Sequence, residues 1–158
     1  MLLNRNGFTL IELMVVVVTI GILAAIVVPK FARAHTSATI AAAGEDILAM
    51  TQALENHNTN NGYWPAETAA GVSPPEVISR FKGESPFGKL CPIGSVYDYD
   101  NKSVNGTNTI SIAIQPSAAS PATSIVDAQS LDAFLDDGVL NSGRFQSSGN
   151  GYSYRVSP

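Results

Sequence analysis

The apolar residues divide the chain into a long apolar N-terminal segment and a mixed remainder. Within Phe8–Val28 every side chain is apolar, glycine or threonine except Glu12. As an α-helix this segment would be roughly 31 Å long, which is enough to cross the hydrocarbon core of a bilayer. The pattern predicts one membrane-spanning helix. Its orientation stays open, because Arg5 precedes the segment while Lys30 and Arg33 follow it.

Beyond the apolar segment the pattern becomes that of an amphipathic helix. Apolar residues recur at steps of three and four, namely Ile40, Ala43, Ile47, Met50 and Leu54. Such a stripe covers one face of a helix and needs a covering layer. The asparagines and glycine of residues 57–62 predict the end of the helix. One helix is therefore expected from about residue 9 to about residue 57, with its second half serving as the spine of a folded head.

The remainder predicts a small α+β head. Four short segments alternate apolar and polar residues around turn-rich sequences, which predicts two antiparallel hairpins: 96–100 with 109–115, and 143–146 with 152–156. Short helices are expected within 74–81, which begins with two prolines, and within 124–137. The predicted fold class is α+β, with a long N-terminal helix packed on a small antiparallel sheet.

A short motif opens the apolar segment. Gly7-Phe8-Thr9-Leu10-Ile11-Glu12 places a glycine, an aromatic residue and a glutamate at the start of an apolar helix. It resembles the processing site of the type IV pilin and type II secretion pseudopilin superfamily. The resemblance covers the leader and the first helix. It implies that a prepilin peptidase cuts between Gly7 and Phe8 and methylates the new N-terminus at Phe8.

The resemblance also implies how the chain is organised. The expected parts are a leader peptide (1–7), a transmembrane and assembly half of the helix (8–29), an amphipathic half (30–58) and a globular head (59–158). Pro29 resembles the helix-bending proline of the family, and a proline inside a helix removes a backbone hydrogen bond and introduces a kink. The alternative is that the helix stops at Pro29. The alanine-rich sequence beyond Pro29 argues against a stop.

Glu12 is unfavourable in lipid and requires an explanation. An ionised side chain at the centre of a membrane helix costs roughly 2.5–3.5 kcal/mol on insertion scales. The resemblance implies that its partner is the methylated, positively charged amine of Phe8, from a neighbouring subunit during assembly or from the same chain before it. The alternative is a glutamate that reaches the membrane surface without a specific partner.

The function implied by the resemblance is that of a structural subunit of a membrane-anchored helical filament. The expected location is the bacterial inner membrane, with one membrane span, the head in the periplasm or outside the cell, and a filament after assembly. Expected partners are further copies of the chain, other pilins or pseudopilins, prepilin peptidase, and the assembly ATPase and platform. Two alternatives are an anchored binding module that does not polymerise, and a secreted enzyme behind a signal peptide that ends poorly at Ala24-Ala25-Ile26.

Pilin and pseudopilin remain alternatives within the superfamily. The chain lacks the two cysteines that many pilins use to close a C-terminal loop, and it lacks a clear calcium-binding loop of the major pseudopilin type. Its single cysteine, Cys91, cannot form an intrachain disulfide, so the head is held by packing alone or Cys91 pairs between chains.

Composition and motifs offer little other chemistry. The formal net charge of −4 argues against binding to nucleic-acid phosphates. There is no phosphate-binding glycine loop, paired-cysteine motif or nucleophile elbow, so neither an enzyme nor a cofactor is expected. His35 and His57 are too few and too far apart to suggest a metal site.

Two acidic segments are candidate metal sites. Residues 98–103 begin like a calcium loop, but Lys102 stands at a ligand position and no glycine follows it. Asp132, Asp136 and Asp137 could bind calcium as the family does, although a solvated helix end is the favoured interpretation. The sequence therefore predicts no metal site.

Overall fold

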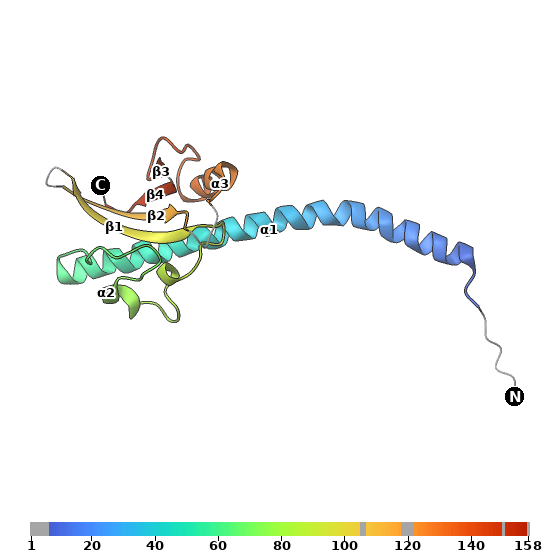
Figure 1. Ribbon diagram of the computed structural model, residues 1–158, viewed down its shortest axis with the longest axis horizontal. Coiled ribbons are helices and arrows are strands. Elements are labelled where there is room, and N and C mark those ends of the chain that lie inside the picture. Colours follow the sequence, from blue (N-terminus) through green and yellow to red (C-terminus); the bar gives the residue numbers. More distant parts are fainter. Residues whose placement is uncertain (1–6, 105–106, 118–121, 150, 158) are drawn as a thin grey trace, which may run out of the picture. The chain divides into compact units, whose positions relative to one another are not determined.

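The computed structural model describes residues 7–104, 107–117, 122–149 and 151–157 (Figure 1). Its contacts divide the chain into two compact units, Met1–Ser37 and Ala38–Pro158. The elements in chain order are α1 (Leu10–Asn61), α2 (Pro75–Ile78), a short 3-10 helix η1 (Pro86–Gly88), β1 (Val96–Val104), β2 (Thr107–Gln115), α3 (Ile125–Leu135), β3 (Phe145–Ser148) and β4 (Gly151–Arg155).

Helix α1 continues through Pro29, so a helix stop at this residue is wrong. A proline removes only one backbone hydrogen bond, and the alanine-rich residues that follow have high helix propensity. The helix ends within a few residues of the predicted end. Gly62 follows it with a left-handed φ of 78°, and its N–H donates to the carbonyl of Asn58 at 2.7 Å.

The four strands form one antiparallel sheet in the order β1-β2-β4-β3. Both predicted hairpins are confirmed. The first hairpin is longer than predicted, because its strands continue to Val104 and restart at Thr107. Asn101, which looked like a turn residue in the sequence, instead belongs to β1. Its side-chain amide donates to the carbonyl of Pro65 at 2.7 Å, so contact with a distant loop favours the extended conformation.

The core of the head lies between α1 and one face of the sheet (Figure 1). The predicted stripe of α1 supplies the fully buried Ala43, Ile47, Met50 and Leu54, while Ile40 is partly buried. Alternate residues of the strands supply the opposing layer, namely Tyr97, Tyr99, Ile110, Ile112, Ile114, Phe145 and Tyr154. Because burying one large apolar side chain contributes roughly 1.5–3 kcal/mol, this layer accounts for much of the stability of the head.

The two short helices also match the predicted regions. Helix α2 begins at Pro75, where the missing N–H has no cost. Helix α3 is capped by Ser124, whose hydroxyl accepts from the backbone N–H of Asp127 at 3.1 Å. It buries Ala128 and Leu131 against the core.

Candidate functional site at the start of the N-terminal helix

The predicted cleavage bond lies just outside helix α1. Gly7, Phe8 and Thr9 precede the helix and form no regular secondary structure. The Phe8 side chain is 79% exposed, and no described atom lies within 4 Å of the position that a side chain on Gly7 would occupy. The backbone of the Gly7–Phe8 bond is therefore outside the hydrogen-bonded helix, in a conformation that an enzyme can reach.

Thr9 and Glu12 together close the first turn of α1. The Glu12 carboxylate accepts from the backbone N–H of Thr9 at 2.9 Å and from the Thr9 hydroxyl at 2.7 Å. The Glu12 backbone N–H donates to the Thr9 hydroxyl at 3.3 Å. This is a capping box, which satisfies backbone donors that the helix leaves open. The sequence analysis missed it, although a threonine three residues before a glutamate is its known signal.

Glu12 therefore has a partner in the isolated chain. Whether Glu12 also meets the amine of Phe8 or reaches the membrane surface remains a prediction. The capping box uses the same carboxylate that the family resemblance assigns to the amine of Phe8. Any pairing between Glu12 and a neighbouring subunit has to share or replace the hydrogen bonds to Thr9.

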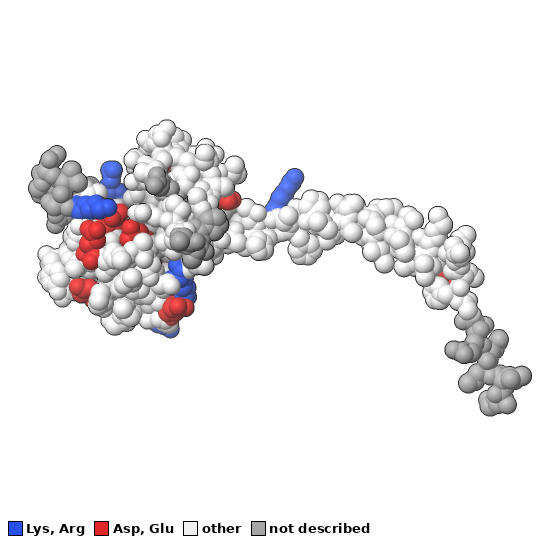
Figure 2. Space-filling model, in the orientation of Figure 1, with Lys and Arg blue, Asp and Glu red and all other residues white. Residues whose placement is uncertain are grey.

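The apolar half of α1 is exposed along its whole length. Its large side chains between Phe8 and Val28 range from 42% exposed at Val27 to 83% at Leu10. The visible surface of this segment carries almost no charge (Figure 2). The helix is long and apolar enough to cross a membrane. Such a surface requires lipid or other apolar helices around it.

Pro29 lies within α1 and is followed at once by the cations Lys30 and Arg33. Beyond them the Thr36 hydroxyl donates to the carbonyl of Ala32 at 3.2 Å, a bond within the helix. The charges mark the end of the apolar segment, as the sequence predicts. The role of Pro29 as a bend remains a prediction.

Asp132, Asp136 and Asp137 lie close together at the end of α3. Each has an oxygen within 4.8 Å of those of the other two. Asp132 is fully buried, and neither of its carboxylate oxygens has a hydrogen-bond partner among the described residues. Burial, followed by the charges of Asp137 and Asp136, raises the pKa of Asp132. The interpretation as a solvated helix end is therefore wrong for Asp132, because the residue points into the head.

The other two members of this trio are exposed and already bonded. Asp136 accepts from the backbone N–H of Arg144, and Asp137 accepts from the Ser142 hydroxyl at 2.7 Å and from the Val139 N–H at 2.8 Å. These hydrogen bonds lower the pKa of Asp137. The trio has the donor chemistry for a hard cation, but two of its carboxylates are engaged by the loop before β3.

The calcium-like segment at residues 98–103 is part of strand β1. Asp98 accepts from the Gln115 side chain at 3.0 Å, and Asp100 forms an ion pair with Lys102 at 2.5 Å. An extended strand cannot wrap its side chains around one ion as a loop does. This segment is therefore not a calcium loop.

Cys91 and His57 are buried in the head, and His35 is exposed. Burial raises the pKa of the Cys91 thiol. A thiol in this position is out of reach of a second folded chain, which argues against pairing of Cys91 between chains. The His57 ring contacts Tyr63 edge-on, with 5.1 Å between centroids.

Comparison with known proteins identifies the N-terminal segment. Residues 2–28 match the family described as the prokaryotic N-terminal methylation motif. The chain is 43% identical over 84 residues to the type IV major pilin protein PilE1 of Neisseria gonorrhoeae, covering 51% of this chain and 36% of the pilin. It is 45% identical over 63 residues to the type II secretion system core protein G of Pseudomonas aeruginosa, covering 40% of this chain and 44% of that protein.

The N-terminal region of this chain is similar to that of type IV pilins and type II secretion pseudopilins. The resemblance to this superfamily that the sequence predicts is confirmed. The corresponding protein G of Escherichia coli is 41% identical over 62 residues, which are 39% of this chain and 43% of that protein. The chain thus spans less than half the length of these curated relatives. Their names describe pilins and secretion-system core proteins rather than enzymes. No solved structure matches the chain.

Proposed function

We propose that this chain is a structural subunit of a membrane-anchored helical filament of the type IV pilin or type II secretion pseudopilin kind. The observation that carries the proposal is the methylation motif, which leads directly into an exposed apolar helix that continues into the spine of a folded head. A helix of this kind is insoluble alone. In a filament, the helices of neighbouring subunits would cover one another, and contacts that do not close on themselves generate a fibre.

In this proposal the N-terminus matures before assembly. Prepilin peptidase cuts the exposed Gly7–Phe8 bond and methylates Phe8. The new amine carries a positive charge that is costly in lipid. Glu12, one helical turn along, is placed to meet this amine in a neighbouring subunit. Pro29 would let the apolar half of α1 bend as the helices pack.

The proposed location is the bacterial inner membrane, with the head in the periplasm or outside the cell. The apolar helix and the named relatives support membrane anchoring. The proposed partners are further copies of the chain, other pilins or pseudopilins, prepilin peptidase, and an assembly ATPase with its platform.

Mass spectrometry of the mature N-terminus and recovery of filaments by shearing test the proposal together. A mature chain that begins with methylated Phe8 and is found in sheared filaments is expected. The variant Gly7→Leu should keep its leader and yield no filaments, because a bulky side chain at the cut replaces a residue without one. A mature chain that begins beyond Ala25 would instead identify a secreted protein. A chain cut at Phe8 that is never found in filaments would favour a non-polymerising anchored module.

A further inference from the structure

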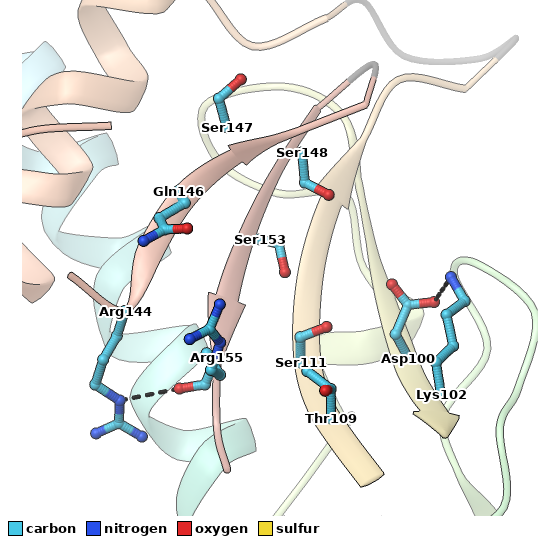
Figure 3. Close-up of a pocket in the computed structure, with 10 residues that line it drawn as sticks. All are labelled: Asp100, Lys102, Thr109, Ser111, Arg144, Gln146, Ser147, Ser148, Ser153 and Arg155. Carbon is cyan, nitrogen blue, oxygen red and sulfur yellow. Dashed lines mark hydrogen bonds and ion pairs between the residues drawn. The ribbon is translucent and has the colours of Figure 1, made fainter. Parts of the chain in front are cut away.

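The central part of the outer face of the sheet, opposite the core, carries polar and small side chains. The pairing of the strands places Asp100, Ser111 and Arg155 in one row across β1, β2 and β4. The next row along the strands contains Asp98, Ala113, Ser153 and Gln146. Figure 3 shows Asp100, Ser111, Ser153 and Arg155 on this face, around a shallow trough.

Charge is separated across this face. Strand β1 carries Asp98 and Asp100, and Glu67 lies close enough to Asp98 to help raise its pKa, after burial and the charge of Asp100. Lys102 is the one cation on this strand and is paired with Asp100. The opposite side of the face carries Arg155 on β4 and Arg144 just before β3. We call Glu67, Asp98 and Asp100 the acidic edge, and Arg144 and Arg155 the basic edge.

Short side chains separate the two edges. Strand β2 contributes Thr109, Ser111 and Ala113 to this face, and Ser111 and Ala113 are buried. Short side chains at the centre of the face and longer ones around it leave the trough that Ser111 lines. Two strand spacings, about 10 Å, separate β1 from β4. The backbones of the acidic and basic edges therefore lie on different sides of the trough.

Arg155 is the most available charge of the basic edge. In the described part of the chain no ion pair and no side-chain hydrogen bond engages its guanidinium. Arg144, in contrast, donates to the carbonyls of Arg155 and Val156 at 2.9 and 3.0 Å and lies over the Tyr154 ring. Arg144 therefore holds the end of the sheet, while Arg155 is free to meet a partner.

The remainder of the head is acidic. All but three of the nine Lys and Arg residues lie in residues 38–158, as do all but one of the thirteen Asp and Glu residues. The head thus has six bases and twelve acids, a formal net charge of −6. Neighbouring heads of this kind repel each other unless cations of one face acids of the next.

We infer that the sheet face is a contact between heads, in which the basic edge of one copy meets the acidic edge of the next. This inference rests on the proposed filament and names one of its contacts. The proposed partner is a second copy of the chain. When heads are repeated side by side, the basic edge of each head lies next to the acidic edge of the following head. The contact is heterologous, because each head uses its basic edge towards one neighbour and its acidic edge towards the other. The first and last heads keep one edge unpaired, so further copies can be added without closing a ring.

Charge exchange in the full-length chain tests this contact. Arg155→Glu places an acid against the acidic edge of the next copy, so the yield of sheared filaments should fall at least about tenfold at matched membrane levels. Glu67→Arg should reduce the yield less, because Asp98 and Asp100 remain. The double variant Arg155→Glu with Glu67→Arg should recover several-fold relative to Arg155→Glu alone. Arg80→Glu, an equal charge change at an exposed residue after α2, should match wild type.

The outcomes separate this contact from the filament itself. Wild type without filaments would overturn the proposed function. The contact alone would be overturned if Arg155→Glu gave filaments at wild-type yield. It would also be overturned if Arg155→Glu and Arg80→Glu lowered the filament yield by the same amount. Loss in both single variants without recovery in the double variant would also overturn the pairing of the two edges. N-terminal processing is measured in every variant, because a change on the head should leave it intact.

Discussion

The ring of Phe134 occupies the space that a side chain on Gly44 would need. Gly44 lies within α1, and Phe134 lies near the end of α3. A glycine inside a helix costs about 1 kcal/mol relative to alanine. Here that cost is offset, because the missing side chain lets an aromatic ring lie directly on the helix backbone. The half-exposed Phe134 thus fastens α3 to the spine of the head.

The variant Gly44→Ala tests this contact, because its effect on the free energy of unfolding should have opposite signs with and without the Phe134 ring. In the wild-type background it should lower the free energy of unfolding by about 1–3 kcal/mol, because the new methyl group displaces the ring. In the Phe134→Ala background the same change should raise stability by up to about 1 kcal/mol, because only helix propensity remains. Thermal unfolding of the purified chain in detergent measures both. Equal effects in the two backgrounds would rule out the contact.

Removal of residues 1–35 should leave a soluble, folded monomer. The stripe from Ile40 to Leu54 keeps its covering sheet, and the contacts of the head lie within Ala38–Pro158. Size-exclusion chromatography and a cooperative thermal transition would check this. Ile47→Asp in the same truncated chain is the control, since a charge in the core should abolish the transition. Aggregation of the unmodified truncated chain would contradict the expected autonomy of the head.

The features predicted from the sequence are those that depend on local patterns. The stripe of α1 and both hairpins follow from residue spacing, which holds wherever one face of an element is buried. The contact of Gly44 with Phe134 and the burial of Asp132 have no local signal, because distant segments of the chain create them. The capping box of Thr9 and Glu12 is different. Its sequence signal, a threonine three residues before a glutamate, overlaps the processing motif, so the pattern predicts processing more readily than capping.

Asp132 should make the head less stable as pH rises. Its pKa is raised in the folded state, so folding favours the protonated form, and that contribution is lost as pH rises from the unfolded pKa through the folded one. Asp132→Asn keeps the shape without the charge. At neutral pH, with a chelator present, it should be more stable than wild type, because the amide has no charge for burial to disfavour. The gain should shrink at acidic pH.

Asp137→Asn is a control for the Asp132 experiment, because its expected effect on stability at neutral pH has the opposite sign. The pKa of Asp137 is lowered by its hydrogen bonds, so its contribution is present at neutral pH and lost as pH falls through its folded pKa. The variant should therefore be less stable than wild type at neutral pH. Thermal unfolding measured from acidic to neutral pH compares the stability of the two variants. If Asp132→Asn is less stable at neutral pH, and calcium stabilises wild type alone, the trio holds a cation instead.

The capping box changes how Glu12 has to be tested. Glu12→Ala removes two things at once, the hydrogen bonds to Thr9 and the charge available to the amine of Phe8. Thr9→Ala removes only the first. Losing a helix cap typically costs about 1 kcal/mol, whereas leaving one charge of a buried pair without its partner costs of order 3–5 kcal/mol. The two variants therefore separate a local role in the helix from a role between subunits.

If Glu12 meets the amine of a neighbouring Phe8, Glu12→Ala should insert at least as well as wild type, because a group that is costly in lipid has been removed. It should also be cut and methylated normally. It should nevertheless give far fewer filaments, since each added subunit would bring an unpaired amine into the core. Glu12→Gln keeps the shape but loses the charge, so it should assemble almost as poorly. Thr9→Ala keeps the charge and should assemble nearly as well as wild type.

Sheared filaments are quantified for all four chains at matched membrane levels. Wild-type yields from Glu12→Ala would end the pairing hypothesis, and equal losses in Thr9→Ala and Glu12→Ala would assign Glu12 to the capping box alone.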